Sequence, residues 1–298
     1  MATWGITYQG SKSAIADSII ASLPSGKRFV DLFGGGFAMS HCALFSYKYK
    51  SVLYNDINPL LVQLIKDAID GKYNRSHFIP EWISRDEFYQ KKDTDGYVRY
   101  CWSFAGAGKE YIYGKDSEEF KRQGHEFCVH KTPVNGLAFS CDSDDIHQRR
   151  LALNQWCKEQ YEQRYELESL ERLQRLEGLE ALQKLERSNN LQITCMDYRD
   201  YQYQDGDVVY CDIPYTNTAS RNDDDYDVSF DAGAFYTWAI RQRYPVYMSS
   251  YSLGGIVWEG EKTVTMSAVD NSTKRREVVY CIDDNFVTPK KAVQTALF

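Results

Sequence analysis

Short apolar segments alternate with helical patterns in two separate parts of this chain. Near the amino end, strands are predicted at 28–33 and 51–54, each followed by a helix, at 37–47 and 60–69. Strands that alternate with helices are typical of a parallel sheet with helices on both faces. The alternation stops near residue 75 and resumes after Asn190, so one doubly wound α/β domain with an insertion explains it better than two tandem domains.

The remaining boundaries follow from this interruption. Candidate strands after Asn190 lie at 191–195, 208–211, 246–249 and 278–282, with a helix at 235–243. Residues 1–75 and 190–298 are therefore assigned to one catalytic domain, and 76–150 to an inserted recognition region. The alternative for 76–150 is a capping excursion without a ligand of its own.

Residues 151–189 differ in composition from the rest of the chain. Leucines recur at every third position from Leu167 to Leu185, separated by charged and amide side chains. On an α-helix a three-residue step turns about 300°, so these leucines would circle the helix rather than form one stripe. Long 3₁₀ helices, which would align them, are uncommon. We predict an α-helix over 151–166, leave the conformation of the repeat open, and expect it to act as a spacer or brace.

Composition narrows the class of protein. No apolar run reaches transmembrane length, and residues 1–10 lack the features of a signal peptide, which predicts a soluble cytoplasmic protein. The eight cysteines show no C-x-x-C spacing, so neither a zinc cluster nor structural disulfides are expected. The net charge of −7 counts mildly against nucleic-acid binding, although a local basic face could still meet phosphates.

The segment Asp212-Ile213-Pro214-Tyr215 follows the apolar run 207–211. That run reads as a buried strand ending in a turn, and ligands of open α/β sheets bind at the carboxyl ends of strands. An acid, a backbone carbonyl, a rigid proline and an aromatic ring can together hold a planar exocyclic amine while the ring stacks beneath it. The segment predicts a site for such an amine.

Three further segments lie at predicted strand ends. The first strand carries Asp31 and Phe33 and is followed by Gly34-Gly35-Gly36, which matches neither a dinucleotide fingerprint nor a phosphate loop. An acid there suits a cationic or amine-bearing ligand, such as the methionine end of S-adenosylmethionine, although a triple glycine can also be a simple tight turn. Asp56, after the second strand, could accept hydrogen bonds from ribose hydroxyls or cap the next helix.

Asp197 and Tyr198 close the strand at 191–195. An acid and a ring at this position could meet an adenine, with its amine on Asp197 and its face near Tyr198. Alternatively, both residues shape the turn toward Asp200.

The order of these segments resembles that of the Dam-type DNA adenine-N6 methyltransferases, especially shorter phage and prophage members. Tyr8-Gln9-Gly10-Ser11-Lys12 is similar to the family's aromatic-x-Gly-Gly/Ser-Lys motif. Three later segments resemble its cofactor loop, its ribose-binding acid and its catalytic tetrad, in that order: Asp31–Gly36, Asn55–Asn58 and Asp212–Tyr215. The resemblance implies a Rossmann-like S-adenosylmethionine-dependent methyltransferase domain with an inserted target-recognition region. It implies cofactor contacts from Tyr8, Gly10, Lys12, Asp31, Phe33, Gly34, Gly35, Gly36, Asp56, Asp197, Tyr198 and Asp212.

The implied reaction is methylation of adenine N6 in double-stranded DNA. The target base must leave the helix to be reached. Tyr215 would stack on it, while the Asp212 carboxylate and the Ile213 carbonyl would accept hydrogen bonds from its amino group, and Pro214 would hold the turn rigid. Two positions depart from the family pattern: Ile213 stands where proline is usual, and Thr7 where lysine is frequent.

Candidate DNA contacts come from two places. The stretch 130–136 lies where the family has a target-recognition hairpin, so Asn135 could read an adenine edge and Lys131 could meet phosphate, or Asn135 and Gly136 could simply form a turn. Lys274, Arg275 and Arg276 resemble the family's basic loop and could grip the DNA backbone, or form a solvated charge run.

Two other functions remain as alternatives: a methyltransferase for RNA or a protein amide, and an inactive DNA-binding remnant. Asp212 favours an aminopurine or aminopyrimidine, because relatives that act on amides usually begin the tetrad with asparagine. A monomer or weak dimer is expected. The recognition sequence, with GATC as the family-level expectation, and the biological role, such as restriction protection in a restriction-modification system, stay open.

Overall fold

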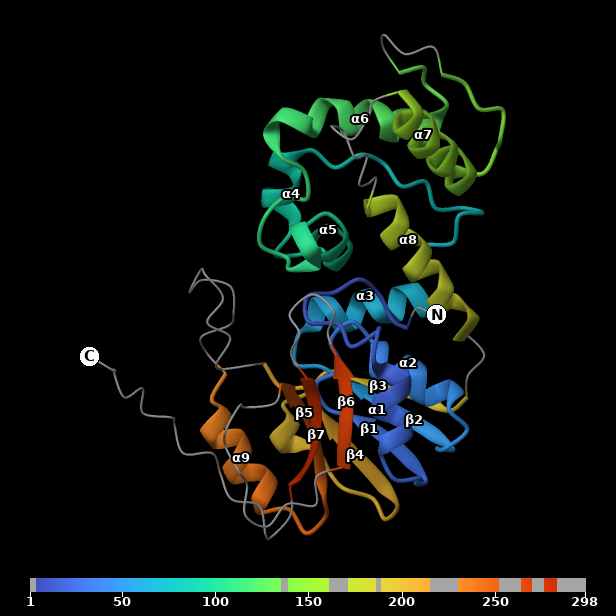
Figure 1. The fold of residues 1–298 in the computed structure, drawn as a ribbon. Coiled ribbons are helices and arrows are strands. Elements are labelled where there is room, and N and C mark those ends of the chain that lie inside the picture. Colours follow the sequence, from blue (N-terminus) through green and yellow to red (C-terminus); the bar gives the residue numbers. More distant parts are fainter. Residues whose placement is uncertain are drawn as a thin grey trace, which may run out of the picture. The chain divides into compact units, whose positions relative to one another are not determined.

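The computed structural model describes residues 4–134, 139–160, 171–185, 189–214, 230–251, 264–269 and 276–282 (Figure 1). Contacts within the chain divide it into two compact units. The helical unit comprises Met1–Ser11, Gly35–Phe37 and Asn58–Asn189, and the sheet unit comprises Lys12–Gly34, Ala38–Ile57 and Asn190–Phe298. The division into domains predicted from the sequence stays a prediction beside these units.

The sheet unit contains a seven-stranded sheet in the order β3-β2-β1-β4-β5-β7-β6. The strands are β1 (Arg28–Asp31), β2 (Ser51–Asn55), β3 (Leu191–Thr194), β4 (Asp207–Cys211), β5 (Val246–Tyr251), β6 (Val264–Val269) and β7 (Arg276–Ile282). Neighbours from β3 to β5 are parallel, whereas β7 runs antiparallel to both β5 and β6. The mostly parallel, Rossmann-like α/β fold predicted from the sequence is confirmed.

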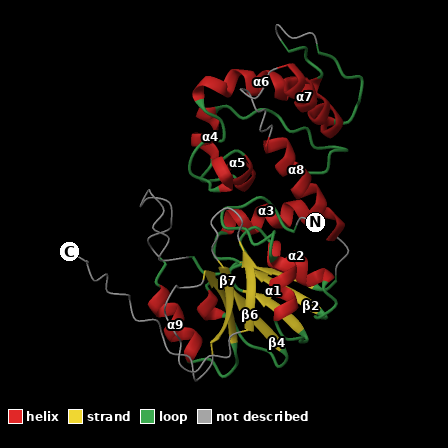
Figure 2. Cartoon of the chain, viewed as in Figure 1, coloured by secondary structure: helices red, strands yellow, loops and turns green. Residues whose placement is uncertain are grey.

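Helices cover both faces of this sheet (Figure 2). Val30 of β1 packs in a core cluster with Phe235 of α9 (Ala232–Ile240), whereas the next residue, Asp31, contacts Ser40 of α2 (Ala38–Phe45). Successive side chains of a strand point to opposite faces, so α9 and α2 lie on different sides of the sheet. The sequence did not predict α1 (Ala16–Ser22), which packs against α2, or β6.

The strand order reverses beside β1, whose neighbours are β2 and β4. Val30 pairs with Leu53 on one side and Val209 on the other. In open α/β sheets, ligands bind outside the carboxyl ends of the strands at this switch point. The topology therefore predicts a ligand site at the carboxyl ends of β1, β2 and β4.

The helical unit contains more regular structure than the sequence predicted. Its helices are α3 (Pro59–Ile69), α4 (Arg85–Lys91), α5 (Gly96–Cys101), α6 (Lys115–His130), α7 (Ile146–Gln160) and α8 (Glu171–Leu182). The helix predicted at 151–166 begins earlier, at Ile146, and residues 161–170 lie outside the described part. In the region 76–150 the sequence showed no repeating strand–helix pattern, yet this region contains three of these helices and the start of α7.

The described part of the leucine repeat, residues 171–185, is helical. Leucines 173, 176, 179 and 182 of α8, and Leu185 just beyond it, are all at most 5% exposed. Leucines that circle a helix can all be buried only when the helix has neighbours on several sides, and α8 contacts α3, α5 and α7. The repeat thus forms core in this unit, which fits a brace and not an exposed spacer.

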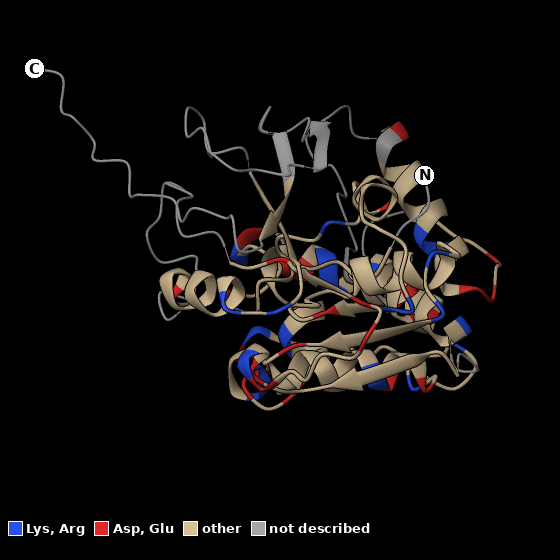
Figure 3. Ribbon diagram, turned by 90° about the horizontal axis from the view of Figure 1, so that it is seen from below, with Lys and Arg blue, Asp and Glu red and all other residues tan. Residues whose placement is uncertain are grey.

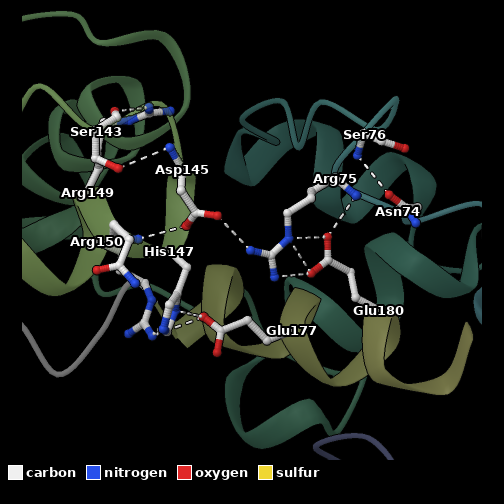
Figure 4. A network of polar contacts seen from close by, with 11 residues as sticks. Asn74, Arg75, Ser76, Ser143, Asp145, His147, Arg149, Arg150, Glu177 and Glu180 are labelled. Carbon is white, nitrogen blue, oxygen red and sulfur yellow. Dashed lines mark hydrogen bonds and ion pairs between the residues drawn. The ribbon is translucent and has the colours of Figure 1, made fainter. Parts of the chain in front are cut away.

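Polar contacts join α8 to the segments around it (Figure 4). The Arg75 guanidinium lies 2.9 Å from Asp145 and 2.5 Å from Glu180, while Glu177 lies 2.5 Å from His147 and 3.0 Å from Arg150. These contacts connect α8 with α7 and with the loop after α3. None of the described helices is both long and apolar enough to span a membrane.

Candidate functional site

Asp212 immediately follows β4 and has two polar neighbours from other segments. Lys12 Nζ lies 2.8 Å from Asp212 Oδ1, and both side chains are largely buried, at 7% and 19% exposure. Ser249 Oγ of β5 donates to the same carboxylate oxygen at 3.3 Å and lies 2.6 Å from the Tyr210 hydroxyl. The carboxylate is therefore fixed in position, with its charge balanced by an ammonium group.

The residue after Asp212 departs from the family pattern, and the structure shows what replaces proline there. The Ile213 side chain is 5% exposed and packs in the core cluster that includes Val209 and Phe235. Burial of this side chain anchors the turn to the core, whereas a proline would restrict the turn through its ring. Pro214 ends the described part of this segment, and Tyr215 lies outside it.

Asp31 ends β1 and is almost fully buried, at 1% exposure. Ser40 Oγ donates to its Oδ2 at 2.8 Å, whereas Oδ1 is buried without a hydrogen-bond partner. Burial raises the pKa of Asp31 to about 7, with smaller contributions from the nearby acids Asp212 and Asp56. A buried acid beside other acids, with one oxygen unpaired, is a favourable position for a cationic group.

Asp56 follows β2, and the sequence left open whether it contacts a ribose or caps the next helix. The side chain that caps α3 is Asn58, which accepts from the amides of Leu60 and Leu61 at 3.1 and 3.3 Å. Asp56 is therefore not the cap of this helix. Its effect on the pKa of Asp31 shows that the two acids lie near each other at this edge of the sheet.

The glycines of the first loop have close neighbours within the protein. A Cβ on Gly34 would lie 2.2 Å from the Tyr54 ring, and one on Gly36 would lie 2.6 Å from Tyr8 Cβ. Both distances are too short for any side chain, so the two positions require glycine. Within the helical unit, Tyr8 also lies beside Gly35, which has a φ of 47°.

Asp197 and Tyr198 occupy the turn after β3. Asp197 caps the short 3₁₀ helix Tyr198–Asp200, and its carboxylate lies 2.5 Å from Arg199 Nη2, which lowers the pKa of Asp197. This matches the alternative in which the acid shapes the turn, so any ligand would have to share Asp197 with Arg199. Tyr198 packs against Phe33 and Trp238, with ring centroids 5.2 and 5.0 Å apart.

The predicted DNA contacts are only partly described. Lys131 follows α6 with a left-handed backbone, φ 59°, and pairs with Asp144, so an acid already neutralises its charge. Asn135, Lys274 and Arg275 lie outside the described residues, and Arg276 is the first residue of β7. Figure 3 shows basic and acidic residues interspersed along the ribbon.

Sequence reasoning found the acids at the strand ends and, through the resemblance, Lys12, but it missed Ser40 and Ser249. Ser40 lies nine residues after Asp31 and Ser249 lies 37 residues after Asp212, and nothing in the sequence marks either serine as a partner of the acid. Across the described ranges, no group of three or more His, Cys, Asp or Glu side chains could hold a metal ion.

The fold and the acidic strand ends define a Rossmann-like methyltransferase domain. Residues 8–232 match the family model of the D12 class N6 adenine-specific DNA methyltransferases, and the chain belongs to this family. It is an adenine-specific DNA methyltransferase, whose reaction is the S-adenosylmethionine-dependent methylation of adenine N6 in DNA. A search of curated proteins gives no match.

Proposed function

We propose that this chain methylates a flipped-out adenine in double-stranded DNA, with Asp212 as the residue that holds the target amine. The observation that carries this proposal is the position of Asp212 at the switch point, with its carboxylate held by Lys12 and Ser249. A carboxylate fixed in this way can accept a hydrogen bond from an amino group without reorganising.

The residues at the edge of the sheet suit S-adenosylmethionine as the cofactor. Asp31 offers a buried carboxylate with one unpartnered oxygen, and its pKa is raised first by burial and then by the acids nearby. A cation beside it would pair with this oxygen and favour the charged carboxylate. Asp56 is proposed to accept from the ribose hydroxyls, and Phe33 and Tyr198 to line the adenine side. When bound, the cofactor supplies an electrophilic methyl group on a sulfonium centre.

The remaining steps are assigned to the tetrad. The Asp212 carboxylate and the Ile213 carbonyl accept hydrogen bonds from the target amine, which directs the nitrogen lone pair toward the methyl donor. Pro214 limits movement of the turn, and Tyr215 is proposed to stack on the extruded base. Positioning of this kind lowers the activation free energy by roughly several kcal/mol, and it needs no covalent intermediate.

Lys12 gives the site a second property. Its ammonium group lies 2.8 Å from Asp212 Oδ1 and holds the carboxylate in place. An incoming group that cannot donate a hydrogen bond would face this acceptor unpaired, which disfavours its binding. This selects for an amine over a carbonyl edge.

The test uses tritiated S-adenosylmethionine with unmethylated DNA, RNA or cell protein as acceptor. We expect label in DNA, recovered as N6-methyladenine after digestion. Asp212→Ala is expected to abolish transfer while cofactor binding stays within a few-fold, and Asp205→Ala, an exposed acid paired with Lys27, serves as the control. Label in RNA or protein alone would refute the DNA substrate, and near-normal turnover by Asp212→Ala would remove this residue from the mechanism.

A further inference from the structure

The side chain of Asn55 connects the ends of three strands of the sheet. It is fully buried at the end of β2, with 0% exposure. Its Nδ2 donates to the carbonyls of Leu32 and Met196, both at 3.0 Å. Its Oδ1 accepts from Thr194 Oγ1 at 2.9 Å and from the Met196 amide at 3.0 Å.

These four contacts use the whole hydrogen-bonding capacity of the carboxamide, two donors and two acceptor lone pairs. The backbone carbonyl of Asn55 accepts as well, from the Gly34 amide at 2.8 Å. A buried polar side chain with every partner in place fixes its neighbours strongly, because the loss of any one partner leaves a buried group unsatisfied.

The segments that Asn55 joins are those to which the cofactor contacts are assigned. Leu32 precedes Phe33 and Gly34, Asn55 itself precedes Asp56, and Met196 precedes Asp197 and Tyr198. The β2–β3 ladder ends with the pair Asn55 and Thr194, and the β1–β2 ladder ends with Asp31 and Tyr54, so Leu32 and Met196 lie just beyond these ladders. The side chain therefore adds direct bonds from the end of β2 to Leu32 and Met196, beside the backbone bond between Gly34 and Asn55.

We propose that Asn55 is a positioning residue that sets the three loops of the S-adenosylmethionine site at their binding distance. This inference rests on the proposed function. The Asn55 side chain acts through Leu32 and Met196, and the cofactor would contact the residues that follow them. A change at Asn55 should therefore weaken cofactor binding more than it slows methyl transfer.

Asn55→Asp is the sharpest variant, because it keeps the shape and Oδ1 but places an oxygen where Nδ2 faced two carbonyls. A matched control comes from the opposite end of the sheet. There the Asp207 carboxylate accepts from Arg28 at 2.7 and 2.9 Å, from the Gln204 amide at 2.8 Å and from the Tyr201 hydroxyl. Asp207→Asn disturbs a comparable polar network of the sheet unit, away from the carboxyl ends of the strands.

The measurement is the Kd for S-adenosylmethionine without DNA, by titration calorimetry, together with Tm. We expect Asn55→Asp to raise the Kd by at least about tenfold, and Asp207→Asn to leave it within about twofold despite a similar loss of Tm. At saturating cofactor, kcat of Asn55→Asp should stay within about threefold of the wild type, with the defect confined to KM. An unchanged Kd for Asn55→Asp, or an equal loss in Asp207→Asn, overturns the inference.

Thr194 provides a milder pair of variants in case Asn55→Asp does not fold. Thr194→Val removes one donor to Asn55 Oδ1 with little change in shape and is expected to raise the Kd about threefold, whereas Thr194→Ser keeps the hydroxyl and the wild-type Kd. An equal Kd for the wild type, Thr194→Val and Thr194→Ser overturns the inference. A wild-type chain that binds no S-adenosylmethionine refutes the proposed function itself, while normal wild-type binding with unaffected variants refutes only the role of Asn55.

Discussion

Asp31 is the residue at which stability and function conflict most directly. Its carboxyl group is buried, and its pKa in the folded chain is raised to about 7 from an ordinary value of 3.8. The folded state thus binds a proton more strongly than the unfolded state, so the free energy of unfolding falls as pH rises from about 4 to 7 and then levels off. A residue that lowers stability at neutral pH is expected where charge serves binding.

Asp31→Asn removes this charge while its carboxamide oxygen can still accept from Ser40. We expect the variant to be more stable than the wild type at pH 8 by about 1–4 kcal/mol, with the difference shrinking toward pH 4. Denaturant unfolding between pH 5 and 8 measures it, and the exposed Asp200→Asn is the control. Cofactor affinity should fall below pH 7 in the wild type and be weak at every pH in Asp31→Asn. A stability difference that does not vary with pH would contradict this account.

The site acids could be predicted from sequence because each ends or directly follows a predicted strand. Asp31, Asp56 and Asp212 stand beside β1, β2 and β4, and the rule that ligands bind at carboxyl ends locates them without a structure. Lys12 was named as a site residue only through the resemblance of residues 8–12. Its pairing with Asp212 could not be predicted, because the two residues are far apart in sequence and nothing local marks the contact.

At the scale of elements, burial and polar contacts contribute differently to α8. Leu179 is 0% exposed, whereas Arg75 is nearly half exposed in its pairs with Asp145 and Glu180. Exposed ion pairs contribute little, about 0–1 kcal/mol, while a buried leucine contributes several times more. The leucines, and not the ion pairs, should therefore hold this helix.

We expect Leu179→Ala to lower the free energy of unfolding by about 2–4 kcal/mol and Arg75→Ala by less than about 1 kcal/mol. Denaturant unfolding followed by circular dichroism compares the two. Deletion of one leucine triplet within α8 removes one buried leucine and moves each later leucine into the position of the one before it, so we expect a loss at least as large as that of Leu179→Ala. Equal losses in the two point variants would mean that the ion pairs matter more than their exposure indicates.

The strands were easier to predict than the inserted helices for a physical reason. Buried parallel strands are largely apolar runs, and Asp207–Cys211, which is apolar after its first residue, shows this plainly. By contrast α6 is rich in charged residues and contains Gly124 within a buried stretch, which weakens any periodic pattern. The capping box of α4, Ser84 with Glu87, was readable, but a helix of seven residues is too short for periodicity to support it.

For the whole molecule, the net charge of −7 means that DNA affinity must come from a few local cations. Lys131 is a weak candidate because Asp144 already pairs with it. Lys274, Arg275 and Arg276 are the stronger candidates from sequence. The two groups should therefore respond differently to substitution.

We expect the triple variant Lys274→Ala, Arg275→Ala, Arg276→Ala to weaken DNA binding and to reduce the salt dependence by up to about three counterions. Lys131→Ala should change neither by more than about twofold. Fluorescence anisotropy at several salt concentrations measures both, with cofactor binding as the control for folding. A larger loss from Lys131→Ala than from the triple variant would reverse the assignment.

The order in which the strands occur along the chain has a consequence for synthesis. In the sheet, β1 lies between β2 and β4, yet β4 begins only at Asp207, after the entire insertion. A growing polypeptide leaves the ribosome with the first strand exposed on one edge until this late partner emerges. Pairing across such long sequence separation is slow, so the nascent chain should depend on chaperones during this interval.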